Sequence, residues 1–235
     1  MRYNQDGDYM IGLKHPYISV AYEGGNSFGG SQRLSGNSTL ASCGCGVIAA
    51  ADLLLYISAW HKGHCYLEMD PERANSIKVD AYRDWVNWLR KKYFPLIPHF
   101  GMNGLGLMAG MQLFFKHHAL PYSCVWCLSD RNLWEKVREM LDNDIPVIMS
   151  IGPNFPRVWK HGAVNLYSKK ENGEYVATSS VKAHFITVTA IDDEWLEVSS
   201  WGRVHYINRR KYEEFVSKYS AAFVSNILYV KKKQD

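Results

Sequence analysis

The chain has 235 residues, of which 47% are hydrophobic, 14% aromatic and 21% charged, with a formal net charge of +4. This composition supplies enough apolar side chains for a packed core and excludes an intrinsically disordered chain. Part of the positive charge lies in three lysines at 231–233, and no basic stripe with interleaved aromatic residues accompanies it. We therefore expect no nucleic-acid partner.

The first 17 residues lack the apolar stretch of a secretory signal, and no apolar run is long enough to predict a membrane span. The sequence therefore predicts a cytoplasmic protein without membrane contact. The oligomeric state is left open.

The first half of the chain is predicted to be mainly helical. Residues 18–42 are expected to form a loop, because glycines alternate there with serine and asparagine. The apolar, alanine- and leucine-rich run at 46–60 predicts a buried helix. Capping residues and helical spacing predict three more helices, at 71–93, at 105–118, and from Ser129 or Asp130 to Leu141.

The second half changes to β-branched residues with a period of two, which predicts strands of an antiparallel sheet. The predicted strands are 145–151, 174–178, 184–191, 195–200, 204–207 and 223–230. A short helix is expected at 208–219. Helices followed by strands are the order typical of an α+β protein.

The segment Ser42-Cys43-Gly44-Cys45-Gly46 leads directly into the predicted helix at 46–60. A thiol in the first turn of a helix faces the positive end of the helix dipole, which stabilises the thiolate and prepares a nucleophile. Small residues at this point also allow a helix start to pack tightly, without any catalytic role. The odd count of five cysteines leaves at least one thiol free for chemistry.

His184 begins the apolar strand predicted at 184–191, where histidine is an unusual first residue. It lies far downstream of the cysteine at the helix start. This order, cysteine and then histidine, is the one that a general base carried on a strand requires.

Four blocks together resemble the bacteriocin-processing, double-glycine leader peptidase branch of the papain-like cysteine peptidases. The blocks are Cys45-Gly46, LWEKVREMLDNDIPVIMSI at 133–151, AHFITVTAIDDEWLEVSSWG at 183–202 and YINRRKYEEF at 206–215. The resemblance implies one papain-like α+β domain over residues 1–235. Its N-terminal helical half would pack on a C-terminal antiparallel sheet.

The resemblance also implies the roles of individual residues. Cys45 would be the nucleophile and His184 the base, and the residue that orients the histidine would be Ser200, sixteen residues after it and followed by Trp-Gly. The family has Asp or Asn at that position. The oxyanion residue would be Asn37 or Gln32.

Because Asn37 lies six residues before Cys43, Cys43 is an alternative nucleophile. The small and apolar run that follows a nucleophile of this family begins after Cys45 and favours that residue. The expected function is hydrolysis of a peptide or small amide without a cofactor. The alternative is a binding or regulatory protein that keeps the fold without turnover.

A structural zinc site is a competing interpretation of the same cysteines. Cys43-x-Cys45 and Cys124-x-x-Cys127 contain four thiols, and further candidate ligands are His61, His64 and Cys65. Four thiolates suit tetrahedral zinc, but the first pair has a spacer of only one residue. We therefore expect no metal.

Overall fold

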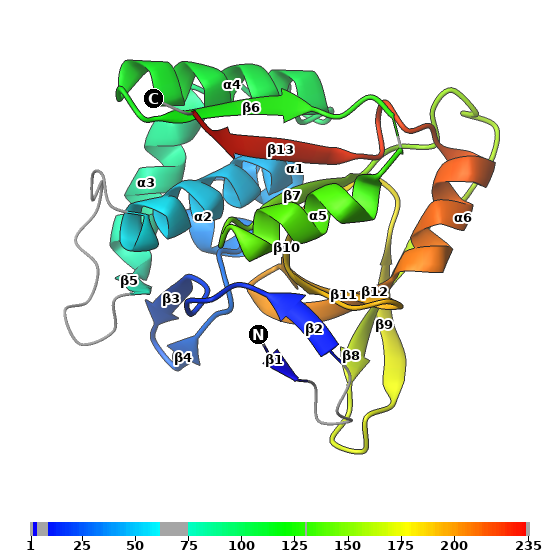
Figure 1. The fold of residues 1–235 in the computed structure, drawn as a ribbon. Helices are drawn as coiled ribbons and strands as arrows, with labels where there is room; N and C mark the ends of the chain where they lie inside the picture. Colours follow the sequence, from blue (N-terminus) through cyan, green and yellow to red (C-terminus); the bar gives the residue numbers. More distant parts are fainter. Residues whose placement is uncertain (1, 4–8, 62–74, 130, 234–235) are drawn as a thin grey trace. The chain divides into compact units, whose positions relative to one another are not determined.

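The computed structural model describes residues 2–3, 9–61, 75–129 and 131–233 (Figure 1). The chain contains two compact units, each assembled from separated segments. The helical unit consists of His15–Trp126, Ser200–Arg203 and Val230–Asp235. The sheet unit consists of Met1–Lys14, Cys127–Ser199 and Val204–Tyr229.

The chain combines helices with a large antiparallel sheet, so the predicted α+β class is confirmed. A single domain over residues 1–235 stays a prediction. None of the helices in the described part of the chain is both long and apolar enough to span a membrane.

The long helix α2 (Cys45–Trp60) is the core of the helical unit, and every residue from Gly46 to Ile57 is buried. Alanines and leucines favour the helix, and an apolar helix surface on all sides can be stable only when neighbours cover it. The predicted helix at 46–60 is confirmed and begins one residue earlier, at Cys45.

Two further helices, α3 (Val79–Lys92) and α4 (Gly104–His117), pack on α2. The ring of Trp85 on α3 meets the ring of Phe114 on α4 edge to face, with 6.0 Å between the ring centroids. The predicted helix at 105–118 is confirmed as α4. In the same unit, β6 (Tyr122–Trp126) packs against α4 and was not predicted.

The prediction of a helix at 71–93 places its start too early, because α3 begins at Val79. Residues 71–74 lie outside the described part of the chain, and residues 76–78 form a strand, β5 (Ser76–Lys78). The Asn75 side chain donates a hydrogen bond to the Tyr17 carbonyl at 2.7 Å. This bond holds the chain beside β3 (Ser19–Tyr22), with which β5 pairs in parallel.

Residues 18–42 contain regular structure, so the prediction of a loop is wrong. The strand β3 also pairs with β4 (Gly25–Asn26), and a 3-10 helix η1 (Gln32–Ser35) and a short helix α1 (Ser38–Cys43) follow. The glycines serve the turns between these elements, for example Gly24 with φ of +94°.

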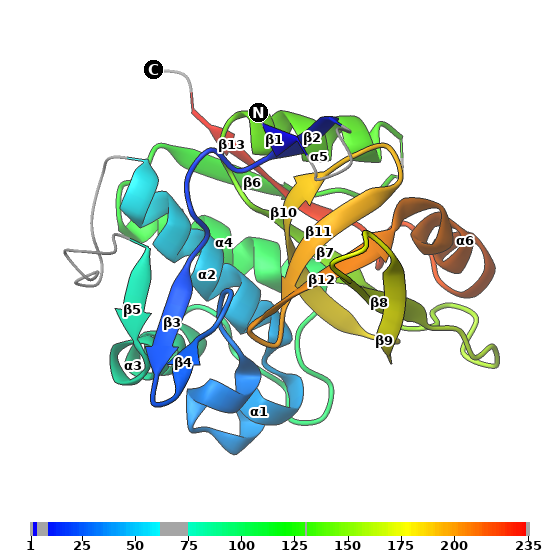
Figure 2. The same cartoon turned by 90° about the horizontal axis from the view of Figure 1, so that it is seen from below.

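The sheet unit is built around β10 (His184–Ile191), all of whose residues are buried. The strand order is β13-β7-β10-β11-β12-β8-β9, and β2 also pairs with β10. Figure 2 shows β10, β11 and β12 side by side. The bounds are β1 (Arg2–Tyr3), β2 (Tyr9–Gly12), β7 (Val147–Ile151), β8 (Val164–Lys169), β9 (Tyr175–Val181), β11 (Trp195–Ser200), β12 (Arg203–Asn208) and β13 (Ile227–Lys232).

Most of these strands were predicted, and β10 and β11 have the predicted bounds. The strands β1, β2 and β8 were not predicted, and β13 begins at Ile227 rather than at residue 223. Residues 223–226 instead form a turn, in which the amide of buried Asn226 donates to the carbonyls of Ala222 and Ser129.

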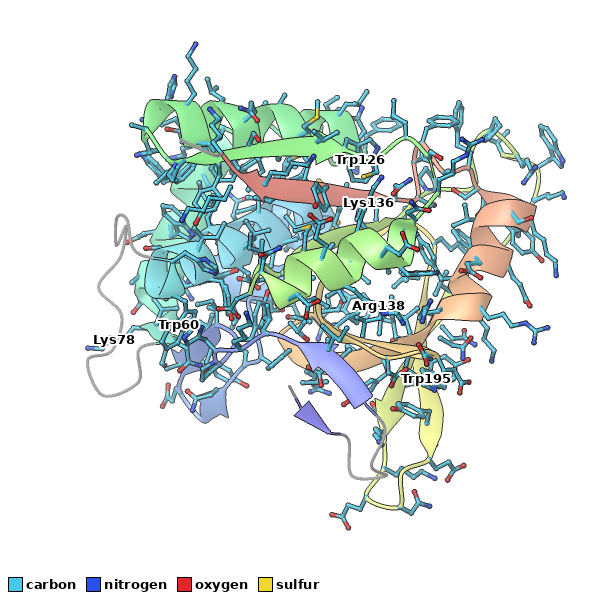
Figure 3. The ribbon with its side chains drawn as sticks, viewed as in Figure 1. Trp60, Lys78, Trp126, Lys136, Arg138 and Trp195 are labelled. Carbon is cyan, nitrogen blue, oxygen red and sulfur yellow. The ribbon has the colours of Figure 1, made fainter. Side chains whose placement is uncertain are left out.

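Two helices accompany the large sheet. The helix α5 (Leu133–Asp142) packs on β2, β7 and β10, as Figure 1 shows. From α5, Arg138 reaches the turn after β10, where its guanidinium lies 2.7 Å from an Asp193 carboxylate oxygen (Figure 3). The predicted helix at 208–219 is confirmed as α6 (Arg209–Tyr219), which is capped by the Asn208 side chain.

The predicted start of α5 at Ser129 or Asp130 is wrong. The hydroxyl of Ser129 accepts a hydrogen bond from the Arg131 backbone N–H, which forms a turn instead of a cap. The residue before α5 is Asn132, whose backbone is left-handed with φ of 57°. A left-handed residue cannot continue a right-handed helix toward its N-terminus, so the helix begins at Leu133. Asp130 lies outside the described residues.

Candidate active site

The two cysteines at the helix start lie on different helices. Cys43 is the last residue of α1, Gly44 separates the helices, and Cys45 is the first residue of α2. A Cβ atom at Gly44 would lie 2.6 Å from the Leu40 carbonyl oxygen, which is too close for any other residue. Glycine is therefore needed at the junction between α1 and α2, directly before Cys45.

The helix dipole distinguishes the two thiols. Cys45 lies at the positive end of a 16-residue helix, where a thiolate is stabilised. Cys43 lies at the opposite, negative end of a helix of six residues. Both side chains are partly exposed. The local structure therefore favours Cys45 as the more readily ionised thiol.

Cys43 also has contacts that hold its thiol on α1. Its Sγ lies 3.2 Å from the Thr39 carbonyl oxygen and 3.9 Å from the Ile97 carbonyl oxygen. The turn at 97–101 approaches Cys43 closely, because a Cβ atom on Gly101 would lie 3.0 Å from the Cys43 carbonyl oxygen. These contacts hold the Cys43 sulfur against α1 and the turn at 97–101.

The two candidate oxyanion residues take part in the structure around α1. The Asn37 side chain caps α1, since its Oδ1 accepts from the Leu40 backbone N–H at 3.1 Å. The buried Gln32 amide donates to the carbonyls of Leu40 and Ala41 at 3.1 and 3.3 Å. The Gln32 Nε2 is thus directed at the last turn of α1, immediately before Cys45.

His184 is in the sheet unit, at the start of the central strand. It pairs with Ile151 of β7 and is 8% exposed. Burial lowers the pKa of His184 to about 4, and the nearby His205 on β12 lowers it further in the same direction. The imidazole is therefore neutral at pH 7, which is the form that accepts a proton.

Ser200 is the last residue of β11 and is 5% exposed. By strand alternation it shares a face of β11 with Val198, which pairs with Val188 of β10. It leads into a tight turn, in which Trp201 and Gly202 have φ of 52° and 77°. In the helical unit the Gly202 carbonyl accepts a hydrogen bond from the Phe28 N–H at 2.9 Å.

The cysteine and the histidine belong to different units, with Cys45 in the helical unit and His184 in the sheet unit. Their pairing stays a prediction. Ser200 belongs with the turn that hydrogen-bonds to Phe28, in the helical unit.

The sequence analysis missed a buried carboxyl group, Asp52 of α2, which is 2% exposed. Its Oδ1 accepts from the Tyr82 hydroxyl at 2.7 Å. Its Oδ2 accepts from the Gly30 N–H at 2.8 Å and from the Tyr17 hydroxyl at 3.3 Å. Burial raises the pKa of Asp52 to about 6, and the three hydrogen bonds partly oppose that rise. The signal in the sequence was one acidic residue inside an apolar helix.

The described residues contain no group of three or more His, Cys, Asp or Glu side chains placed to hold a metal ion. Burial raises the pKa of the Cys124 thiol to about 12, and its Sγ lies 3.5 Å from the Met108 carbonyl oxygen. Without a metal such a thiol stays protonated, and zinc would have to displace its proton to bind the thiolate. Two of the candidate ligands, His64 and Cys65, lie outside the described residues.

The sequence matches no protein-family model, and a search of curated proteins finds no match. The local environments of the candidate residues therefore carry the functional argument.

Proposed function

We propose that the chain is a cysteine hydrolase of papain-like fold that cleaves a peptide or small amide, with Cys45 as nucleophile and His184 as base. The observation that carries the proposal is the position of Cys45, a partly exposed thiol on the first residue of a long buried helix. The imidazole of His184 is neutral at pH 7, so it has a ring nitrogen that can accept a proton, while its lowered pKa makes it a weaker base than an ordinary histidine.

In the proposed reaction His184 takes the thiol proton while Cys45 Sγ attacks the carbonyl carbon. The tetrahedral intermediate collapses, the amine leaves with the proton from His184, and water hydrolyses the thioester to release the acid and the free thiol. The oxyanion would be held by the Cys45 backbone N–H at the start of α2 and by the Asn37 or Gln32 amide. This mechanism requires Cys45 Sγ within about 3–4.5 Å of a His184 ring nitrogen.

Ser200 is proposed to orient the imidazole. Its hydroxyl oxygen can accept a hydrogen bond from the Nδ1–H group, but a neutral oxygen stabilises an imidazolium ion less than a carboxylate does. The proposal therefore includes a weaker third member than the aspartate or asparagine of the resembled family.

The test is the rate at which each thiol reacts with iodoacetamide at neutral pH, followed by mass spectrometry of the peptides. We expect Cys45 to react faster than Cys43 and much faster than buried Cys124. On a panel of amides and thioesters, Cys45→Ser should abolish hydrolysis, while the matched Cys43→Ser variant should retain it. Equal, slow labelling of all thiols would contradict an activated Cys45.

A second candidate function, a papain-like binding protein without turnover, is favoured by the Gln32 contacts. The Gln32 Nε2 donates to two backbone carbonyls of α1, and these contacts compete with donation to an oxyanion. The neutral hydroxyl of Ser200, which replaces the Asp or Asn of the resembled family, also favours a binding protein without turnover.

Substituting Ser200→Asn separates the two functions, with Ser200→Ala as the control. Hydrolysis that appears only in Ser200→Asn would identify a non-catalytic protein that has lost its orienting amide. Wild-type hydrolysis that is lost in Cys45→Ser would exclude this second function.

A further inference from the structure

A loop in the sheet unit, residues 152–163 between β7 and β8, exposes an unusual set of large apolar side chains. Trp159 is 71% exposed, Val158 67% and Phe155 45%. Phe223, 46% exposed, adjoins them, with its ring centroid 5.8 Å from that of Phe155. Single exposed apolar residues are ordinary, but a group of four on adjoining segments indicates an interaction surface.

The loop is anchored, so these side chains are held outward by its backbone. The Ser220 hydroxyl donates to the Pro153 carbonyl at 2.9 Å, and the Arg157 guanidinium donates to the Ser217 carbonyl at the end of α6. Directly after the second anchor, the Lys160 N–H donates to the Arg157 carbonyl at 2.9 Å, which closes the turn that carries Val158 and Trp159 at its tip.

The charge of the loop indicates the chemistry of its partner. Residues 152–163 contain Arg157, Lys160 and His161 and no acidic residue. The adjoining segment, residues 220–225, carries no charge at all. Apolar and aromatic side chains bordered by cations are complementary to an anionic phospholipid surface, where aromatic rings occupy the interface and cations meet phosphate groups.

We propose that the loop at 152–163 docks this protein on anionic phospholipid bilayers, with Val158 and Trp159 entering the interface and Lys160 contacting the headgroups. The inference is independent of the proposed hydrolase function. It departs from the sequence-based expectation that the chain makes no membrane contact.

A second exposed turn supplies a matched control. In the helical unit, Phe100 is 85% exposed and Ile97 is 65% exposed, so this turn also presents large apolar side chains. Residues 97–101 contain neither lysine nor arginine. An anionic bilayer that binds apolar side chains bordered by cations should therefore not bind this turn.

The test is co-sedimentation of the full chain with vesicles of phosphatidylcholine containing about a quarter phosphatidylserine. We expect binding to these vesicles, little binding to phosphatidylcholine alone, and weaker binding at high salt because the headgroup contacts are screened. Trp159→Ala should lower the partition coefficient about tenfold and Lys160→Ala about fivefold. Phe100→Ala should leave it within about twofold. Circular dichroism of each variant checks that it is folded.

Failure of the wild-type chain to sediment with the anionic vesicles would overturn the proposal. So would equal losses in Trp159→Ala and Phe100→Ala, which indicate non-specific adsorption. If the chain instead forms a dimer in ultracentrifugation that Trp159→Ala dissociates, and vesicles are not bound, the loop is a surface for a second copy and the proposal is wrong.

Discussion

Each unit of the chain contains a buried ionisable side chain whose pKa is shifted by burial, and the two pKa values shift in opposite directions. In the helical unit Asp52 has its pKa raised to about 6, and in the sheet unit His184 has its pKa lowered to about 4. The cause is the same, because removal from water disfavours the charged form of either group. The comparison teaches that one physical effect gives the two units opposite dependences of stability on pH.

The surroundings of the two groups differ as well. Asp52 is bound by donors from three separate segments, namely the Gly30 N–H and the hydroxyls of Tyr17 and Tyr82. His184 lies on a strand between two neighbouring strands, where backbone pairing fixes its position. The carboxyl group of Asp52 therefore holds three segments together, whereas the position of His184 is fixed by the pairing of its strand.

The largest expected effect comes from removing the carboxyl group of Asp52. Asp52→Ala would leave two buried tyrosine hydroxyls and the Gly30 N–H without their acceptor, and we expect a loss of about 3 kcal/mol in the free energy of unfolding. Urea unfolding at pH 7 measures it. Asp84→Ala on the exposed side of α3 is the control and should change stability by less than about 0.5 kcal/mol. Equal effects of the two substitutions would contradict the organising role of Asp52.

The second prediction concerns Asp52→Asn and the pH range between about 4 and 6. The folded state holds the Asp52 proton up to pH about 6, whereas the unfolded state releases it near 3.8. The wild-type free energy of unfolding therefore falls from this cause as pH rises, at about 1 kcal/mol per pH unit. Asp52→Asn removes that fall, so its stability should rise more steeply with pH than that of the wild type.

The measurement is urea unfolding of both proteins at several pH values across that range. Asp84→Asn supplies the control for charge alone, since its carboxylate is exposed. Parallel pH curves for wild type and Asp52→Asn would show that the ionisation of Asp52 is not shifted by folding.

The third prediction concerns His184, whose effect on the pH dependence of stability is opposite in sign to that of Asp52. The unfolded state binds a proton on His184 below pH about 6.5, whereas the folded state binds it only below about 4. This histidine therefore makes the free energy of unfolding rise with pH between those values, by about 1 kcal/mol per pH unit. His184→Asn should flatten or reverse the wild-type curve in urea unfolding. An unchanged slope would contradict the buried, neutral state of this imidazole.

The smallest expected effects come from removing, one at a time, the two tyrosine hydroxyls that donate hydrogen bonds to Asp52. Tyr82→Phe removes the 2.7 Å bond and should cost about 1 kcal/mol, while Tyr17→Phe removes the 3.3 Å bond and should cost less. Both variants should also raise the pKa of Asp52 further, because each hydrogen bond favours the carboxylate. Thermal unfolding of the two variants checks the order, and the reverse order would contradict the geometry.

Some of the structure could be predicted from local patterns, because those patterns report burial directly. The bounds of β10 were predicted correctly, since its residues 184–191 carry the β-branched pattern of a strand. The start of α2 at Cys45 was predicted to within one residue for a similar reason. In both segments the chain has one regular pattern and little competition from polar side chains.

The rest depends on contacts between residues far apart in the sequence. The partners of Asp52 lie 35 and 30 residues away, at Tyr17 and Tyr82, so no local pattern shows that a carboxylate is accommodated in α2. The strand β5 likewise forms because it pairs with β3 across more than fifty residues. The candidate residues Cys45 and His184 were identified from helix and strand starts, which are local features.

The last strand of the sheet unit has a consequence for biosynthesis. The strand β13 covers β7, with Ile227 opposite Met149 and Leu228 opposite Ile148. A ribosome must therefore synthesise more than seventy residues after β7 before this edge is paired. Until then the sequence Val-Ile-Met-Ser-Ile is an unprotected apolar edge, the kind of segment that templates aggregation. A chain that stops before Ile227 would keep that edge open permanently and should depend on chaperones to stay in solution.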